Sequence, residues 1–185
     1  MLLARLKSIT SKSSIILEVR AAAFTRNKLC HNERNRVVSC FEVANYFIWL
    51  ARETGSFISN LKLQKLVYYA QAWHLAIHDV PLFEEDFQAW VHGPVIAELY
   101  QKYKSFRWQP ITADVTPQLP PATIEFLEGV SDEYFSCDGY ELERMTHAED
   151  PWILARGGIA HDVASTNQIE KNWMKEYYGA RVEEN

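Results

Sequence analysis

Apolar side chains recur at steps of three and four residues between positions 60 and 78, a spacing that is typical of one helical face. Full burial of one large apolar side chain stabilises a fold by about 1.5–3 kcal/mol, whereas ordering one backbone residue costs about 1–2 kcal/mol. This stripe therefore cannot support the helix in isolation, and we predict a central core helix that other elements cover. His74 lies inside the stripe, so we expect a core histidine whose ring nitrogens have partners. The stripe consists of Leu63, Leu66, Val67, Ala70, Trp73, His74 and Ile77.

A second face of the same segment carries polar side chains, namely Gln64, Lys65, Tyr68 and Gln71. Such a row fits an active site, a binding surface or an ordinary solvated side, and its spacing leaves these alternatives open. Tyr68 is followed by Tyr69, which places one ring in the core and the other on a different face. Several half-exposed tyrosines close together favour contact with another protein.

Glycine, proline and capping residues divide the remaining chain into further helices. Ser39 and Glu42 match a capping box at the start of a helix that would end at Gly55. Residues 82–91 alternate loosely and predict a short strand or extended segment that carries Trp90 inward. We expect the other helices to begin at Gly93-Pro94, to include residues 124–134, 140–145 and 151–156, and to end the domain over 168–178, before Gly179. The fold class is mostly α, a compact single domain of about six or seven helices with at most a small peripheral β element.

Charge divides the chain near residue 38. Residues 1–38 hold eight basic and two acidic side chains, whereas the remainder holds 11 basic and 22 acidic ones. We therefore predict a basic N-terminal extension over 1–38 and one domain over 39–185. For the extension we favour a mis-assigned start near Val37 or Val38, with a disordered arm or a transit peptide as alternatives. Because an acidic domain repels phosphate, binding of nucleic acid is not expected.

The sequence lacks the common signatures of catalytic and nucleotide-binding sites. It contains no GxGxxG, no P-loop lysine, no GxSxG and no HExxH, and its three cysteines form no CxxC pair. We accordingly expect no cofactor and no metal site. No segment has the roughly 18 consecutive apolar residues of a membrane span, and the cysteine usage fits a reducing compartment, so we predict a cytoplasmic protein.

One cluster near the end of the chain allows a catalytic interpretation. His147 and Asp150 lie three residues apart, with His161-Asp162 following, and together they could form a metal or acid–base cluster. A structural interpretation accounts for the same residues, because Thr146 with Glu149 matches a capping box and Asp150 before Pro151 matches an N-cap. We favour the caps and predict that the protein is not an enzyme.

Three blocks, LQKLVYYAQAWHL, the turn WVHGPV and THAEDPW, occur in this order within about residues 40–178. Their order, spacing and residue identities resemble the Panacea domain of SocA-like antitoxins, which occurs in bacterial and phage-associated proteins. The resemblance implies a mostly helical antitoxin that neutralises a cognate toxin, encoded by an adjacent gene, by direct binding and without catalysis. Two alternatives remain, namely a proteolytic adaptor or regulatory interaction module that hands its partner to a cellular protease, and a small hydrolase that uses His147 and Asp150.

The resemblance also marks family-motif residues as candidates for partner binding. We expect Gln64 and Lys65 to bond to the THAEDPW turn, with Lys65 near Glu149 or Asp150, or else to contribute to a partner-facing surface. The candidates are Gln64, Lys65, Tyr68, Tyr69, Gln71 and His74 on the helix, Trp90, Gly93 and Pro94 in the turn, and Thr146, His147, Glu149, Asp150, Pro151 and Trp152 in the last block.

Overall fold

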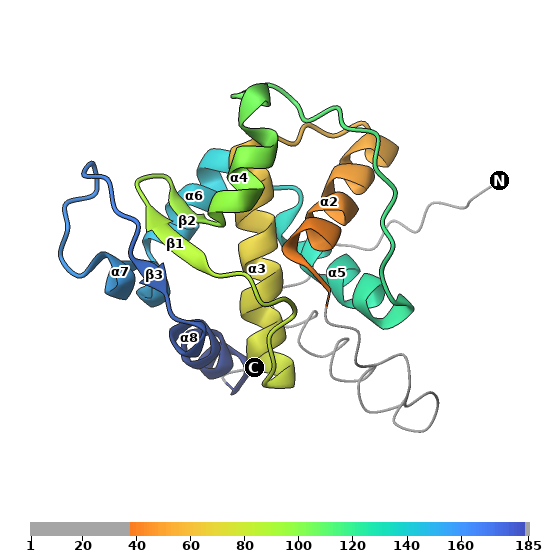
Figure 1. Ribbon diagram of the computed structural model, residues 1–185. Coiled ribbons are helices and arrows are strands. Elements are labelled where there is room, and N and C mark those ends of the chain that lie inside the picture. Colours follow the sequence, from red (N-terminus) through yellow and green to blue (C-terminus); the bar gives the residue numbers. More distant parts are fainter. Residues whose placement is uncertain (1–37, 184–185) are drawn as a thin grey trace.

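The computed structural model describes residues 38–183, so the interpretation of the basic N-terminal extension lies outside the described residues apart from Val38. Within this range the chain forms seven α-helices, one short 3-10 helix and a three-stranded sheet, which confirms a mostly α fold with a small β element (Figure 1). None of the described helices is long and apolar enough to cross a membrane. The elements are α2 (Cys40–Thr54), α3 (Asn60–His78), β1 (Phe87–Trp90), β2 (Gly93–Val95), α4 (Ala97–Tyr103), η1 (Lys104–Phe106), α5 (Pro121–Tyr134), α6 (Gly139–His147), α7 (Asp150–Arg156), β3 (Gln168–Ile169) and α8 (Lys171–Glu183).

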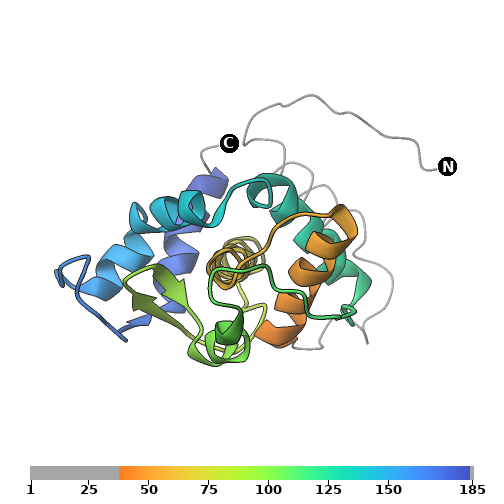
Figure 2. The ribbon, with the colours of Figure 1, turned by 90° about the horizontal axis from the view of Figure 1, so that it is seen from above.

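Helix α3 is the central element of the molecule. Seen along its axis in Figure 2, it lies in the middle of a ring formed by the other helices and the β1–β2 hairpin. Every side chain from Lys62 to Ala72 is buried, on the polar face as well as on the apolar one. The predicted central core helix is therefore confirmed, and its polar face is not a solvated side.

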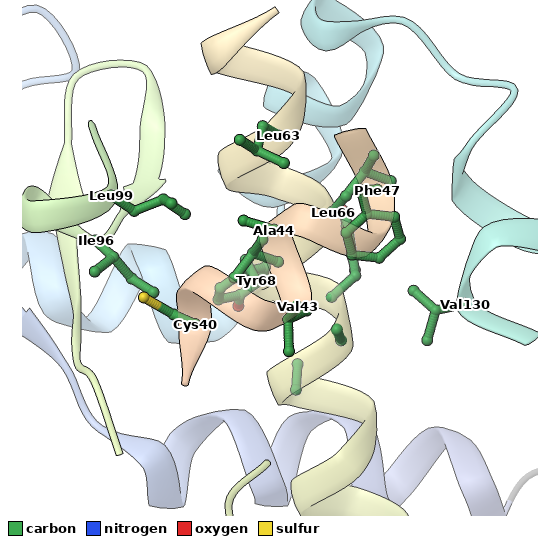
Figure 3. Packing of buried hydrophobic residues seen from close by; sticks show 14 of the residues in the cluster. Cys40, Val43, Ala44, Phe47, Leu63, Leu66, Tyr68, Ile96, Leu99 and Val130 are labelled. Atoms are coloured by element: carbon green, nitrogen blue, oxygen red, sulfur yellow. The ribbon is translucent and has the colours of Figure 1, made fainter. Parts of the chain in front are cut away.

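Helix α2 is determined by local signals that the structure confirms. The Ser39 hydroxyl accepts a hydrogen bond from the Glu42 backbone N–H, and the Glu42 carboxylate accepts one from the Ser39 N–H at 3.0 Å. Gly55 ends the helix in the left-handed conformation, with φ of 64°. The apolar face of α2 packs on α3, and Figure 3 shows Phe47 beside Leu66.

The short sheet corrects one predicted element. Strand β1 pairs with β2 and with β3 in antiparallel fashion, with Ala89 opposite Pro94 and Phe87 opposite Ile169. The predicted strand within 82–91 is present, but the helix expected to begin at Pro94 is wrong, because residues 93–95 form β2 and α4 begins only at Ala97. Strand β2 lies at the edge of the sheet, a position where proline is tolerated because its missing N–H removes no central ladder bond.

The last helix also differs from its prediction. Residues 168–169 form β3, and α8 runs from Lys171 through Gly179 to Glu183. A glycine inside a helix costs about 1 kcal/mol relative to alanine, which is not enough to end a helix that tertiary packing supports. Met174 and Tyr178 of α8 are fully buried in the common core, and Val182 beyond the glycine is also buried.

Candidate functional site

The polar face of α3 bonds to the backbone of the segment that follows the β1–β2 turn. The side-chain carbonyl of Gln64 accepts a hydrogen bond from the Ile96 N–H at 2.9 Å. The Lys65 ammonium donates one to the Pro94 carbonyl at 3.0 Å. Both side chains are buried, so these bonds satisfy polar groups that have no access to water.

Gln71 has the same role about two helical turns further along α3. Its amide carbonyl accepts hydrogen bonds from the backbone N–H groups of Leu82 at 2.8 Å and Phe83 at 3.3 Å. Its amide N–H₂ donates to the Phe83 carbonyl at 2.8 Å. The polar row of α3 thus holds two returning loop segments against the central helix.

The Lys65 side chain lies so close to the β1–β2 turn that position 93 requires a glycine. A Cβ atom on Gly93 would lie 2.8 Å from Lys65 Cε and 2.9 Å from the Thr146 hydroxyl oxygen, and φ of Gly93 is +89°. Burial lowers the pKa of the Lys65 ammonium to about 7, and the Glu143 carboxylate opposes this shift. Residues from all three sequence blocks therefore meet around the Lys65 side chain.

The expected pairing of Lys65 with Glu149 or Asp150 is wrong. Glu149 is instead bound by two tyrosine hydroxyls, from Tyr69 at 3.2 Å and from Tyr178 at 2.6 Å. Burial raises the pKa of the Glu149 carboxyl to about 7, and the hydrogen bonds from the two tyrosines oppose the increase. Glu149 thereby connects α3 with α8 beneath the surface.

The two nested caps predicted for the THAEDPW block are also wrong. Thr146 belongs to the last turn of α6, and its hydroxyl donates to the Glu143 carbonyl at 2.9 Å. Glu149 does occupy the N-cap position of α7, but its side chain makes no capping bond because the tyrosines hold it, and Asp150 is the first helical residue. The capping box in this region lies at Asp138 and Glu141, a D-x-x-E signal that our sequence interpretation missed.

The candidate catalytic histidine takes part in ring packing. His147 stacks on Trp152, with ring centroids 4.1 Å apart, and the His161 ring lies 5.9 Å from that of His147. Burial lowers the pKa of the His147 imidazole to about 4, and its Nε2 has no hydrogen-bond partner among the described residues. Asp150 is exposed. Searched over residues 38–183, the structure contains no group of three or more His, Cys, Asp or Glu side chains placed to hold a metal ion.

The last block is fastened to β1 through its tryptophan and an arginine. Trp152 Nε1 donates to the Trp90 carbonyl at 3.0 Å, and Arg156 Nη1 donates to the Ala89 carbonyl at 3.2 Å. The Trp90 ring is only partly buried and lies against Tyr100, with centroids 5.1 Å apart, so its inward placement is less complete than predicted. The buried Arg156 was not predicted, because a lone arginine before two glycines reads as an ordinary helix end.

His74 is half-buried, and one of its two ring nitrogens has a hydrogen-bond partner, so it meets its prediction as a core histidine only in part. One ring nitrogen, Nδ1, lies 2.8 Å from the Val80 carbonyl and donates a hydrogen bond to it. Burial lowers the pKa of the His74 imidazole to about 4, with the bond to Val80 opposing the shift. His74 is therefore neutral near pH 7 and fastens the C-terminal end of α3.

Most side chains of the motif are buried and are enclosed by the rest of the fold. Their role in the structure is to hold α3, the β1–β2 turn and the α6–α7 corner together. The buried candidates are Gln64, Lys65, Tyr68, Tyr69, Gln71, Gly93, Pro94, Thr146, Glu149, Pro151 and Trp152.

An exposed aromatic cluster lies on the surface near the same turn, and we define it as Trp108, Tyr140 and His92. Trp108 is 57% exposed and Tyr140 is 63% exposed, and their rings lie 6.4 Å apart at 19°. The His92 ring lies 6.2 Å from that of Trp108, and His92 Nδ1 lies 3.0 Å from the Glu143 carboxylate. Our sequence interpretation missed this cluster, since its members come from three distant segments.

Comparison with known proteins identifies the class to which this helical scaffold belongs. The profile of the family described as "Antitoxin SocA-like, Panacea domain" matches residues 63–153, which include all three blocks. Antitoxin SocA of Caulobacter vibrioides is 30% identical over 130 residues, covering 62% of this chain and 69% of that protein. No solved structure matches the chain at a significant level. The chain therefore belongs to the SocA-like Panacea domain family, which confirms the resemblance noted from its sequence.

Proposed function

We propose that this protein is an antitoxin that neutralises a cognate toxin by direct, stoichiometric binding. Its similarity to Antitoxin SocA carries the proposal. The residues that the family model matches, 63–153, span the three sequence blocks and all three members of the aromatic cluster, His92, Trp108 and Tyr140. In this proposal the buried polar side chains of the three blocks build the scaffold, and the toxin binds to exposed side chains.

The distribution of polar groups supports binding over catalysis. The polar side chains of α3 are satisfied by backbone groups of the same chain, as Gln64 and Gln71 illustrate. A general base needs hydrogen-bond reach to a substrate, whereas Lys65 and Glu149 are enclosed by the fold. We therefore assign these groups to stability and not to a reaction.

The direct test uses the gene adjacent to the one that encodes this chain. We expect expression of that gene alone to arrest growth, co-expression of this chain to restore growth, and the two purified proteins to form a one-to-one complex. Failure of the two proteins to associate would overturn the proposal.

Repeating the growth assay in cells that lack their major cytosolic proteases separates stoichiometric inhibition from a proteolytic adaptor. Inhibition by binding persists in such cells, whereas delivery to a protease does not. A hydrolase would instead show turnover with purified protein, and that turnover would disappear in a folded His147→Ala variant.

A further inference from the structure

The aromatic cluster contains two nearly parallel, exposed rings whose centroids lie farther apart than those of a directly stacked pair. Trp108 and Tyr140 lie 6.4 Å apart between centroids, whereas the directly stacked pair Tyr69 and Tyr134 lies at 3.9 Å. A flat group between two rings needs roughly 3.5 Å on each side, or about 7 Å in total. Both side chains are more than half exposed, so the rings have room to rotate toward the separation that such a group requires.

Neighbouring residues position the rings of Trp108 and Tyr140. Tyr140 is in the first turn of α6, which Asp138 and Glu141 cap. Trp108 follows the short helix η1, and the His92 ring stands nearly perpendicular to it, at 89°. The rings are thus presented by a capped helix and a packed turn, which limits the entropy lost when a guest orders them.

Charge determines what kind of flat group fits. Residues 39–185 hold 22 acidic and 11 basic side chains, and three of the basic ones, Lys62, Lys65 and Arg156, are buried. The segments around the rings contain Arg107 and Arg144 but also Asp138, Glu141 and Glu143. The exterior as a whole therefore attracts a cationic partner.

A guanidinium group is both planar and permanently charged, and it stacks on aromatic faces. We propose that Trp108 and Tyr140 form a clamp that takes an arginine side chain of the partner protein between their rings. This inference rests on the proposed function for the identity of the partner, but the chemistry of the clamp can be tested without it.

The test titrates the full chain, labelled with ¹⁵N, with the peptide acetyl-(Gly-Arg)₃-amide at low salt. The Trp108 indole N–H signal is assigned by its disappearance in Trp108→Phe. We expect the arginine peptide to shift this signal in a saturable manner. The same peptide with lysine in place of arginine should bind about 3-fold more weakly, and the peptide with citrulline, whose side chain is planar but neutral, should cause no saturable shift. An unmoved indole signal, or equal binding of the citrulline peptide, would overturn the clamp.

Variants extend the test to the complex with the protein from the adjacent gene. We expect Trp108→Ala and Tyr140→Ala each to reduce the affinity for the arginine peptide and for the partner protein by about 3- to 10-fold. The melting temperature of each variant should be unchanged. Val80→Ala, at an exposed apolar residue beyond the other end of α3, should change neither. If the wild-type complex forms and the two aromatic variants bind as tightly, the clamp is refuted while the antitoxin proposal stands. If no complex forms at all, the antitoxin proposal fails and the peptide titration alone decides the clamp.

Discussion

The hydroxyl of Tyr178 lies 2.6 Å from the carboxylate of Glu149 and donates a hydrogen bond to it. Tyr69 of α3 binds the other carboxylate oxygen at 3.2 Å, so one buried acid links the central helix to the last helix. The Tyr69 ring also stacks on Tyr134 of α5, whose hydroxyl accepts a hydrogen bond from Trp73 Nε1 at 2.9 Å. Helices α3, α5 and α8 therefore share one aromatic and polar junction.

We predict that Glu149→Gln removes a pH dependence of stability. The pKa of Glu149 rises from an ordinary 4.5 to about 7 on folding, so the folded chain keeps a proton that the unfolded chain has lost. The associated stability is fully present below pH 4.5 and is lost as the pH rises through 7. Between pH 5 and pH 8, wild type should lose about 2–3 kcal/mol of unfolding free energy more than the variant. Urea denaturation of both proteins at both pH values measures this difference. An equal change in unfolding free energy for wild type and variant would contradict the prediction.

We predict that Tyr178→Phe destabilises the fold by about 1.5–3 kcal/mol, because it removes a hydrogen bond from a buried acid and leaves the ring packing intact. Chemical denaturation measures the loss. Tyr140→Phe is the matched control, since the Tyr140 side chain is largely exposed, and it should change stability by no more than about 0.5 kcal/mol. Equal effects of the two substitutions would show that the hydrogen bond from Tyr178 to Glu149 does not contribute to the free energy of unfolding.

We predict that Lys65→Ala destabilises the fold by about 2–4 kcal/mol. The change leaves a cavity beside the central helix and deprives the Pro94 carbonyl of its 3.0 Å donor. Lys104→Ala, at an exposed lysine, provides the comparison and should have almost no effect. A Lys65→Ala protein as stable as wild type would show that this lysine does not fasten the turn to α3.

We predict that Gly93→Ala is more harmful than Gly158→Ala, although both glycines have a positive φ, of +89° and +84°. A Cβ at Gly93 collides with Lys65 and Thr146, whereas a Cβ at Gly158 has no heavy atom within 4 Å. Backbone strain alone amounts to about 1 kcal/mol, and the collision should add about 1–3 kcal/mol at Gly93. Thermal denaturation of the two variants checks the order, and equal melting temperatures would rule out the close approach.

Signals that act within a few residues were predictable from the chain, as α2 demonstrates. Ser39 and Glu42 are neighbours in sequence, and their capping box needs no other part of the fold to form. The same kind of local signal predicted a capping box at Thr146 and Glu149 that does not form. The Glu149 carboxylate is bound instead by the hydroxyl of Tyr178, 29 positions away. The helix predicted to begin at Pro94 is wrong for a similar reason. Pairing of its segment with β1 outweighed the local preference of proline for the first turn of a helix.

The sequence by itself determined that the chain is mostly helical, that residues 60–78 form its central helix, and that it shares the blocks of the SocA-like Panacea family. Only the tertiary structure decided that Gln64, Lys65 and Gln71 face the interior, because helical spacing shows which residues share a face but not what covers that face. It also decided that Trp108, Tyr140 and His92 form an exposed aromatic cluster, since these residues become neighbours only when three separate segments fold together.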